Sequence, residues 1–181
     1  MKNNLLTLAT VVAIGFFTNT ASSQTMATVT GTTAGAKLIQ PMTLIQDSPL
    51  HFGTINLLTG AGGDVVLPSN SITRTFDAGV ASGIVAPAPT NAAYSVTGTK
   101  NVAYALTLPA TIVVSEALVP ANTMTISALS ARFKDATGDA VTSILSPTGT
   151  DSFTVGGTLT VAASQNAGVY AGTFNVSVDY N

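Results

Sequence analysis

The sequence predicts an all-β protein, and three observations point to an antiparallel sandwich. Thr, Val and Gly are abundant among the 181 residues, Glu occurs once, and only 8% of residues are charged, which favours pleated sheet over helix. Apolar and polar residues alternate in several runs, as in half-buried strands. Clusters of Gly, Pro and Asn separate these runs at short spacing. Many short strands without intervening helices indicate a sandwich, with a closed barrel as the alternative.

Residues 1–23 have the pattern of a secretory signal peptide. Lys2 stands before an apolar stretch over residues 5–17, and the small residues Ala21 and Ser23 precede the expected cleavage point. The apolar stretch is shorter than the roughly 20 residues of a membrane-spanning helix. We therefore expect an exported protein of the periplasm, cell surface or extracellular space, which does not span a membrane once the signal is removed. The chain has no Cys, so neither a disulfide nor a lipid anchor is expected.

The mature chain is predicted to begin with a flexible arm over residues 24–36. This segment is small and rich in Thr, Gly and Ala, which is typical of a flexible or exchangeable segment. Its weak alternation would allow it to donate a strand to a groove in a neighbouring molecule through Ala27, Val29, Gly31 and Thr33. Residues 37–181 are predicted to form a single β-sandwich domain, which is large enough to bury a core.

Four runs of the mature chain alternate most clearly, and each predicts a strand. They are residues 102–108, 123–128, 153–161 and 170–180. Turns are predicted at residues 60–64, 68–70, 87–89, 98–101, 137–139 and 147–149, where Gly, Pro, Asn and Asp gather. The five Phe of the mature chain and its four Tyr fall on alternating faces, so core packing is their expected role, with a sugar-stacking platform as the alternative.

Composition excludes several classes of function. A nucleic-acid binder needs a basic surface, which six Lys and Arg against eight Asp and Glu do not supply. Without Cys there is no thiol nucleophile and no zinc site of the Cys type. His51 is the only imidazole and is expected in a strand, while Ser82 stands one place too late in residues 79–83 for a nucleophile elbow. We therefore expect no enzyme activity, no catalytic residue and no cofactor.

One loop carries a weak metal candidate. Asp135 and Asp139 lie close together around a Gly, as the carboxylates of a calcium site would. A hairpin turn explains the same residues, because Gly and Asp supply positive φ angles and side-chain hydrogen bonds to the backbone.

The C-terminal residues 168–181 resemble the last strand of chaperone–usher pilus subunits. The resemblance lies in a Gly, an alternating apolar row and a penultimate Tyr, namely Gly168, Tyr170, Phe174, Val176, Val178 and Tyr180. In that family a periplasmic chaperone captures this strand by β-strand pairing, which would make these the strand-pairing residues and a chaperone the partner. A last core strand that simply completes a sandwich is the alternative.

A broader resemblance covers most of the mature chain. Residues 36–44, 50–55, 94–98, 104–109, 156–159, 168–172 and 178–181 look like the landmarks of a family of small secreted bacterial proteins classed as a domain of unknown function. That family is similar to spore-coat-U-like proteins and archaic pilins. The resemblance implies an immunoglobulin-like sandwich and supplies neither an activity nor a catalytic residue.

These observations lead to two hypotheses of function. The first is an exported, non-enzymatic structural protein of the cell surface, fimbrial in type, which self-associates or joins a fibre by β-strand addition. The alternative is a monomeric extracellular binding module, for example for a polysaccharide. Scarce Lys and Glu agree with the first hypothesis, because native edge strands usually carry such charges to avoid pairing.

Overall fold

A computed structural model describes residues 30–31, 33–58, 61–84 and 86–181. The predicted signal peptide lies outside these residues, and so do Ala27 and Val29 of the predicted arm. The chain divides into a unit of residues 1–37 and a unit of residues 38–181. In the first unit, the described residues, including Gly31 and Thr33, are exposed and have no regular secondary structure. All the strands described below belong to the second unit.

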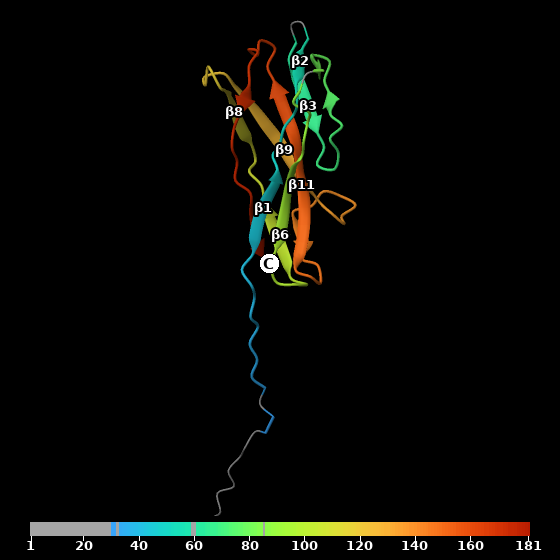
Figure 1. The fold of residues 1–181 in the computed structure, drawn as a ribbon, viewed down its shortest axis with the longest axis vertical. Coiled ribbons are helices and arrows are strands. Elements are labelled where there is room, and N and C mark those ends of the chain that lie inside the picture. Colours follow the sequence, from blue (N-terminus) through green and yellow to red (C-terminus); the bar gives the residue numbers. More distant parts are fainter. Residues whose placement is uncertain (1–29, 32, 59–60, 85) are drawn as a thin grey trace, which may run out of the picture. The chain divides into compact units, whose positions relative to one another are not determined.

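The prediction of an all-β protein is confirmed, since the described residues form thirteen strands and no helix (Figure 1). Every strand pairing is antiparallel. The strands are β1 (Thr43–Ser48), β2 (Ile55–Leu57), β3 (Gly63–Leu67), β4 (Thr75–Phe76), β5 (Val80–Ser82), β6 (Ala92–Thr97), β7 (Ala103–Thr107), β8 (Ile112–Glu116), β9 (Thr123–Phe133), β10 (Thr142–Ile144), β11 (Thr150–Val161), β12 (Tyr170–Ala171) and β13 (Ser177–Tyr180).

The largest sheet has eight strands and is organised around β11. Its main order is β1-β6-β11-β9-β8-β12. The first half of β11 pairs with β6, and its second half pairs with β3, which in turn pairs with β4. The change of neighbour occurs at Gly156, where a Cβ atom would overlap the carbonyl oxygen of Leu67. A glycine is therefore required for the backbones to approach at this point.

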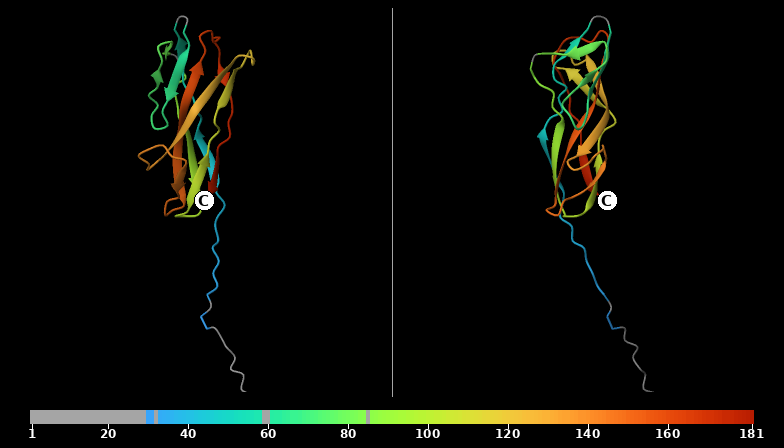
Figure 2. Two further views of the ribbon diagram at one scale, coloured as in Figure 1. Left: turned by 180° about the vertical axis from the view of Figure 1, so that it is seen from behind. Right: turned by 90° about the vertical axis from the view of Figure 1, so that its right-hand side faces the viewer.

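Two smaller sheets complete the domain. One has the order β10-β7-β13, and the other pairs β2 with β5. The inner face of β7 packs Tyr104 and Leu106 against apolar side chains of β6, β9 and β11. Figure 2 shows the sheets from behind and from the side. The three-stranded sheet and the large sheet thus share one core.

Aromatic rings form the centre of that core. Tyr94 stacks on Phe153 with ring centroids 5.1 Å apart, and Phe133 meets both Phe153 and Tyr104 edge to face. A second cluster, built on residues such as Val65, lies under β3 and β8, and partly buried side chains pack against both clusters. At about 25 cal/mol per Å² of buried apolar surface, this packing is the main stabilising contribution in a chain without disulfides.

The strands over 102–108, 123–128 and 153–161 are found as β7, β9 and β11. The prediction of one strand over residues 170–180 is wrong. The segment forms β12 beside β8 in the large sheet and then β13 beside β7 in the small one, so it crosses between sheets. The turn at 60–64 is also wrong in part, because β3 already begins at Gly63. His51 forms an isolated bridge with Thr90 instead of lying in a strand.

Candidate strand-binding seam and polar hollow

Two edge strands border the same side of the domain. In the described part of the chain β1 ends the large sheet, with β6 as its neighbour, and β13 ends the small sheet, with β7 as its neighbour. The phenol of Tyr180 in β13 donates a hydrogen bond to the carbonyl of Gln40 at 2.7 Å, just before β1. It also accepts one from the amide of Thr99 at 2.6 Å, just after β6. The beginning of β1 and the end of β13 therefore meet at one end of the domain.

Because β1 begins where β13 ends, the two strands run in opposite directions, and Figure 1 shows β1 pointing away from the C-terminus. The inner faces of β1, of β13 and of the residues that flank them carry a strip of apolar side chains that pack against the same core cluster but are only half-buried. We call this strip the seam. Its lining residues are Met42, Leu44, Leu50, Phe174, Val176 and Val178.

The free edge of β13 offers backbone groups to an added strand. The amide of Asn181 donates to the carbonyl of Ala103 at 3.1 Å. In an antiparallel ladder the backbone amides of every second residue point to the partner strand. Because the amide of Asn181 points to β7, the amide of Asp179, two residues earlier, does so as well. The amide of Val178 then points to the free edge. Apolar side chains with unpaired edge amides are what strand addition requires, since main-chain bonds provide affinity and side-chain pockets set register.

The predicted strand-pairing residues thus fall into two groups. Phe174, Val176, Val178 and Tyr180 lie at the seam. Gly168 and Tyr170 lie elsewhere, next to β8. A Cβ atom on Gly168 would lie 2.7 Å from the carboxylate of Glu116, a buried group that accepts a hydrogen bond from Asn122. Tyr170 pairs with Glu116 across the strands, and its phenol donates to the carbonyl of Asn166.

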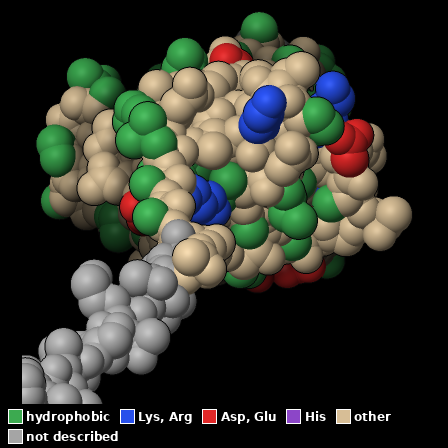
Figure 3. Space-filling model, turned by 90° about the horizontal axis from the view of Figure 1, so that it is seen from below, with side chains coloured by type: hydrophobic (Ala, Val, Ile, Leu, Met, Phe, Trp, Pro, Cys, Tyr) green, Lys and Arg blue, Asp and Glu red, His purple; other side chains and the backbone are tan. Residues whose placement is uncertain are grey.

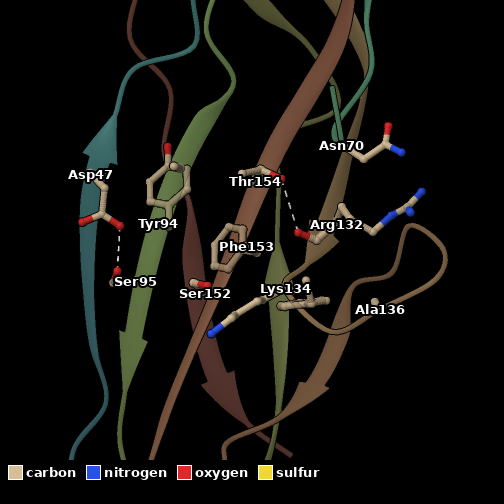
Figure 4. Close-up of a pocket in the computed structure, with 12 residues that line it drawn as sticks. Asp47, Asn70, Tyr94, Ser95, Arg132, Lys134, Ala136, Ser152, Phe153 and Thr154 are labelled. Atoms are coloured by element: carbon tan, nitrogen blue, oxygen red, sulfur yellow. Dashed lines mark hydrogen bonds between the residues drawn. The ribbon is translucent and has the colours of Figure 1, made fainter. Parts of the chain in front are cut away.

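A shallow polar hollow of about 590 Å³ lies on the outer face of the large sheet (Figure 4). Ser95 in β6 donates a hydrogen bond to the carboxylate of Asp47 at 2.7 Å. Thr154 in β11 donates to the carbonyl of Ser69 at 2.6 Å. The side chain of Lys134 extends across β11 toward Ser152. The hollow therefore presents hydroxyls, the carboxylate of Asp47, the guanidinium of Arg132 and the ammonium group of Lys134, next to apolar side chains.

The two residues of the weak calcium candidate have different surroundings in the structure. Asp135 is exposed in the loop after β9, whereas Asp139 accepts hydrogen bonds from Ser69 at 2.7 Å and from Arg132 at 2.8 Å. Partial burial opposes ionisation of Asp139, but the hydrogen bonds from Ser69, Ser130 and Arg132 and the charge of Arg132 outweigh it and lower its pKa. Arg132 thus holds the position that a cation would need. The described residues contain no group of three or more potential metal ligands.

His51 and Ser82, the candidates for nucleophilic catalysis, have structural partners. The Nδ1 atom of His51 accepts a hydrogen bond from the amide of Gly53 at 2.7 Å. The hydroxyl of Ser82 accepts one from Arg74 at 2.7 Å. The described residues provide no hydrogen bond from His51 to a serine or a carboxylate, so no catalytic arrangement is assembled around them.

Two sets of polar interactions that the sequence did not reveal connect distant segments. Arg74 donates to the carbonyls of Phe52 and Thr54 and lies 4.9 Å above the ring of Phe76, and burial lowers its pKa. Tyr104 is fully buried and donates to Asp151 at 2.8 Å. Their partners are far apart in sequence, so no local spacing could have indicated them.

None of the Tyr and Phe side chains in the described residues is exposed. The alternative of an exposed sugar-stacking platform is therefore not found there. Charged side chains are scattered over mostly uncharged surface on the end viewed in Figure 3. Within the part of the chain that the structure describes, there is no helix that would be able to cross a lipid bilayer.

The comparison with family models decides the family. The model of the family described as Domain of unknown function (DUF4402) matches residues 42–180. The chain belongs to this family. The match covers β1 to β13, so the seam and the hollow are built from residues of the family domain. No curated protein and no solved structure matches the chain.

Proposed function

We propose that this member of the DUF4402 family is an exported, non-enzymatic structural protein of the cell surface that assembles by β-strand addition at the seam. The observation that carries the proposal is the pair of edge strands, β1 and β13, which border half-buried apolar side chains instead of a closed core. An extended segment inserted there would bury the strip and pair with the free amides of β13.

The finer fold assignment belongs to the same proposal. An immunoglobulin-like sandwich, as in the pilins that the C-terminal segment resembles, would place the two edge strands on either side of an acceptor groove. The core shared by the two sheets supports this assignment. The scarcity of charge at the edges supports pairing as well, because β13 contains a single charged residue, Asp179.

The proposed occupant of the seam is the arm of a second copy, residues 24–36. Small residues such as Ala27 and Val29 would suit a narrow strip next to the half-buried side chains of β13. A periplasmic chaperone is the proposed partner before assembly, since an unfilled apolar seam favours capture by another strand. Export is checked by sequencing the N-terminus of the secreted protein, which should begin at Gln24.

The test compares the full mature chain with a variant that lacks residues 24–36. Sedimentation velocity should show assemblies for the full chain and only monomers for the variant, while thermal unfolding shows that both are folded. Val29→Asp should also block assembly, because a charge would enter the seam. Thr28→Asp is the matched control, since its side chain would face away from the groove. Assemblies that persist without the arm would contradict the proposal.

The polar hollow supports a second candidate, a monomeric module that binds an acidic polysaccharide. Hydroxyls, a carboxylate and the ammonium of Lys134 could bind sugar hydroxyls and a uronic acid carboxylate. A chain that remains monomeric and loses polysaccharide binding upon Lys134→Ala would favour this candidate over strand addition. Titration calorimetry with an acidic oligosaccharide distinguishes the two.

A further inference from the structure

The end of the domain opposite the C-terminus exposes an apolar surface. The connection between β8 and β9 reads Ala-Leu-Val-Pro-Ala over residues 117–121, and every one of these residues is exposed. Leu118 is 89% exposed and Val169 is 75% exposed. The two lie on adjoining segments, since the amide of Ala117 donates to the carbonyl of Val169 at 2.9 Å. We call Leu118, Val119 and Val169 the apolar end.

Exposed apolar runs of this kind mark interaction surfaces in soluble proteins. Figures 1 and 2 both place the β8–β9 connection at the end of the domain far from the C-terminus. A second exposed apolar pair lies next to the beginning of β1, where Leu38 is 95% exposed and Ile39 is 48% exposed. The domain thus carries apolar side chains at both ends, and the arm joins it directly at the Leu38 end.

We infer that the apolar end binds Leu38 and Ile39 of a second copy, so that copies stack head to tail. This inference rests on the proposed strand addition, and the direction of the strands carries it. A strand that adds to β13 in the antiparallel sense, as every pairing in the domain is, runs away from the C-terminal end. The added strand therefore ends near the apolar end of the acceptor copy. Leu38 of the donor copy follows the arm in the chain, so it lies next to that apolar end.

The length of the arm agrees with this path. The arm, residues 24–36, is nearly as long as the C-terminal segment, residues 168–181. That segment runs from the β8 side of the domain to the C-terminal end (Figure 1). An extended arm rises about 3.3 Å per residue, so it would span the same distance along the seam. The donor's Leu38 and Ile39 would then reach Leu118 and Val169 without further chain.

The opposite direction predicts a different assembly. A strand antiparallel to β1 would run toward the C-terminal end and bring the Leu38 residues of two copies together, which gives a closed pair. A head-to-tail contact is heterologous, so it repeats from copy to copy and gives a ring or an open fibre. The exposed run at residues 117–121 favours head-to-tail stacking over the closed pair, because only head-to-tail stacking covers this run.

Disulfide trapping tests the contact directly, because the chain has no Cys. Full-length exported Leu38→Cys and Leu118→Cys proteins are mixed and oxidised, and the dimers are separated on non-reducing gels. The matched control replaces Leu118→Cys with Ile144→Cys, which is 65% exposed on β10. Because a fixed contact raises the local thiol concentration, the Leu38–Leu118 mixture should give about ten times more mixed disulfide than the control.

Equal yields in the two mixtures would overturn the inference, and so would a predominance of disulfides between two Leu38→Cys chains. If assembly still requires residues 24–36 while the Leu38–Leu118 disulfide does not exceed the control, head-to-tail stacking fails and strand addition stands. If the full chain never assembles, both fail.

Discussion

At the residue scale, one buried phenol shows how polar groups are satisfied inside this domain. Tyr104 donates to Asp151 from a fully buried position, and Ser143 donates to the same carboxylate oxygen at 2.6 Å. Burial raises the pKa of Tyr104, and the hydrogen bond and negative charge of Asp151 add to this effect. The neutral phenol is therefore the form that the folded state requires.

Tyr104→Phe should lower the free energy of unfolding by about 1 kcal/mol at neutral pH, because Asp151 loses one of its donors. The difference should shrink in alkali. An unfolded Tyr ionises near about pH 10 while the folded Tyr104 keeps its proton, so its contribution is complete below that pH and declines above it. At about pH 11 the wild type should have lost roughly 1.4 kcal/mol relative to the variant, so the difference seen at neutral pH should be abolished or slightly reversed. Urea unfolding at both pH values checks this, and a pH-independent difference would contradict it.

At the element scale, β11 is the strand on which the large sheet depends. It pairs with β6, β3 and β9, and its register with β9 shifts between Gly156 and Thr158. The positive φ of Ala128 in β9 falls opposite this irregularity. The extra residue of this bulge belongs to β9, and the bulge lies close to the point where the other edge of β11 changes its neighbour from β6 to β3.

Gly156→Val should lower the free energy of unfolding by about 3 kcal/mol or more, because its Cβ atom would overlap the Leu67 carbonyl oxygen and approach the Ser69 amide nitrogen to 2.5 Å. Gly138→Ala is the control, since a Cβ atom there has no neighbour within 4 Å. Denaturant unfolding measures both. Equal stabilities of the two variants would show that β11 does not need a glycine at this crossing.

The elements differ in how well the sequence predicts them. Alternation reveals β7, β9 and β11, because the side chains of β7 and β11 keep one face inward, and those of β9 do so up to the bulge at Ala128. The same alternation continues through residues 170–180 while the backbone changes sheets. A two-residue alternation indicates which face of a strand is buried, but it does not indicate which strand is its neighbour. The crossing from β12 to β13 therefore could not be predicted. Gly62 and Gly63 suggested a turn, although Gly63 begins β3.

Part of the candidate site could also be predicted. The apolar row of the C-terminal segment identified three residues of the seam, Phe174, Val176 and Val178. Its other border, formed by Leu44 in β1 and by Met42 just before it, became evident only from the sheet order, because the two edges are far apart in sequence. Arg74 and Asp151 were missed for the same reason. Their partners are brought together by the fold and not by local spacing.

At the scale of the whole molecule, the protein relies on burial and backbone pairing. Among the described residues a single ion pair, between Arg132 and Asp139, is present. Such an exposed pair contributes little. Low charge leaves the edges of both sheets without the repulsion that commonly prevents association. An acceptor seam and an apolar end are consistent with a molecule whose surface is completed by other copies.

The most direct test of strand addition is amide hydrogen exchange of β13 in the full mature chain, measured as dilute monomer and as assembly. In the monomer the amide of Val178 should exchange rapidly, since it faces the free edge, while that of Asn181 should be protected by Ala103 of the neighbouring segment. Upon assembly the exchange of Val178 should slow by at least about tenfold, as expected for an amide that gains about 1.4 kcal/mol of protection. An assembly in which Val178 exchanges as fast as in the monomer would contradict strand addition at the seam.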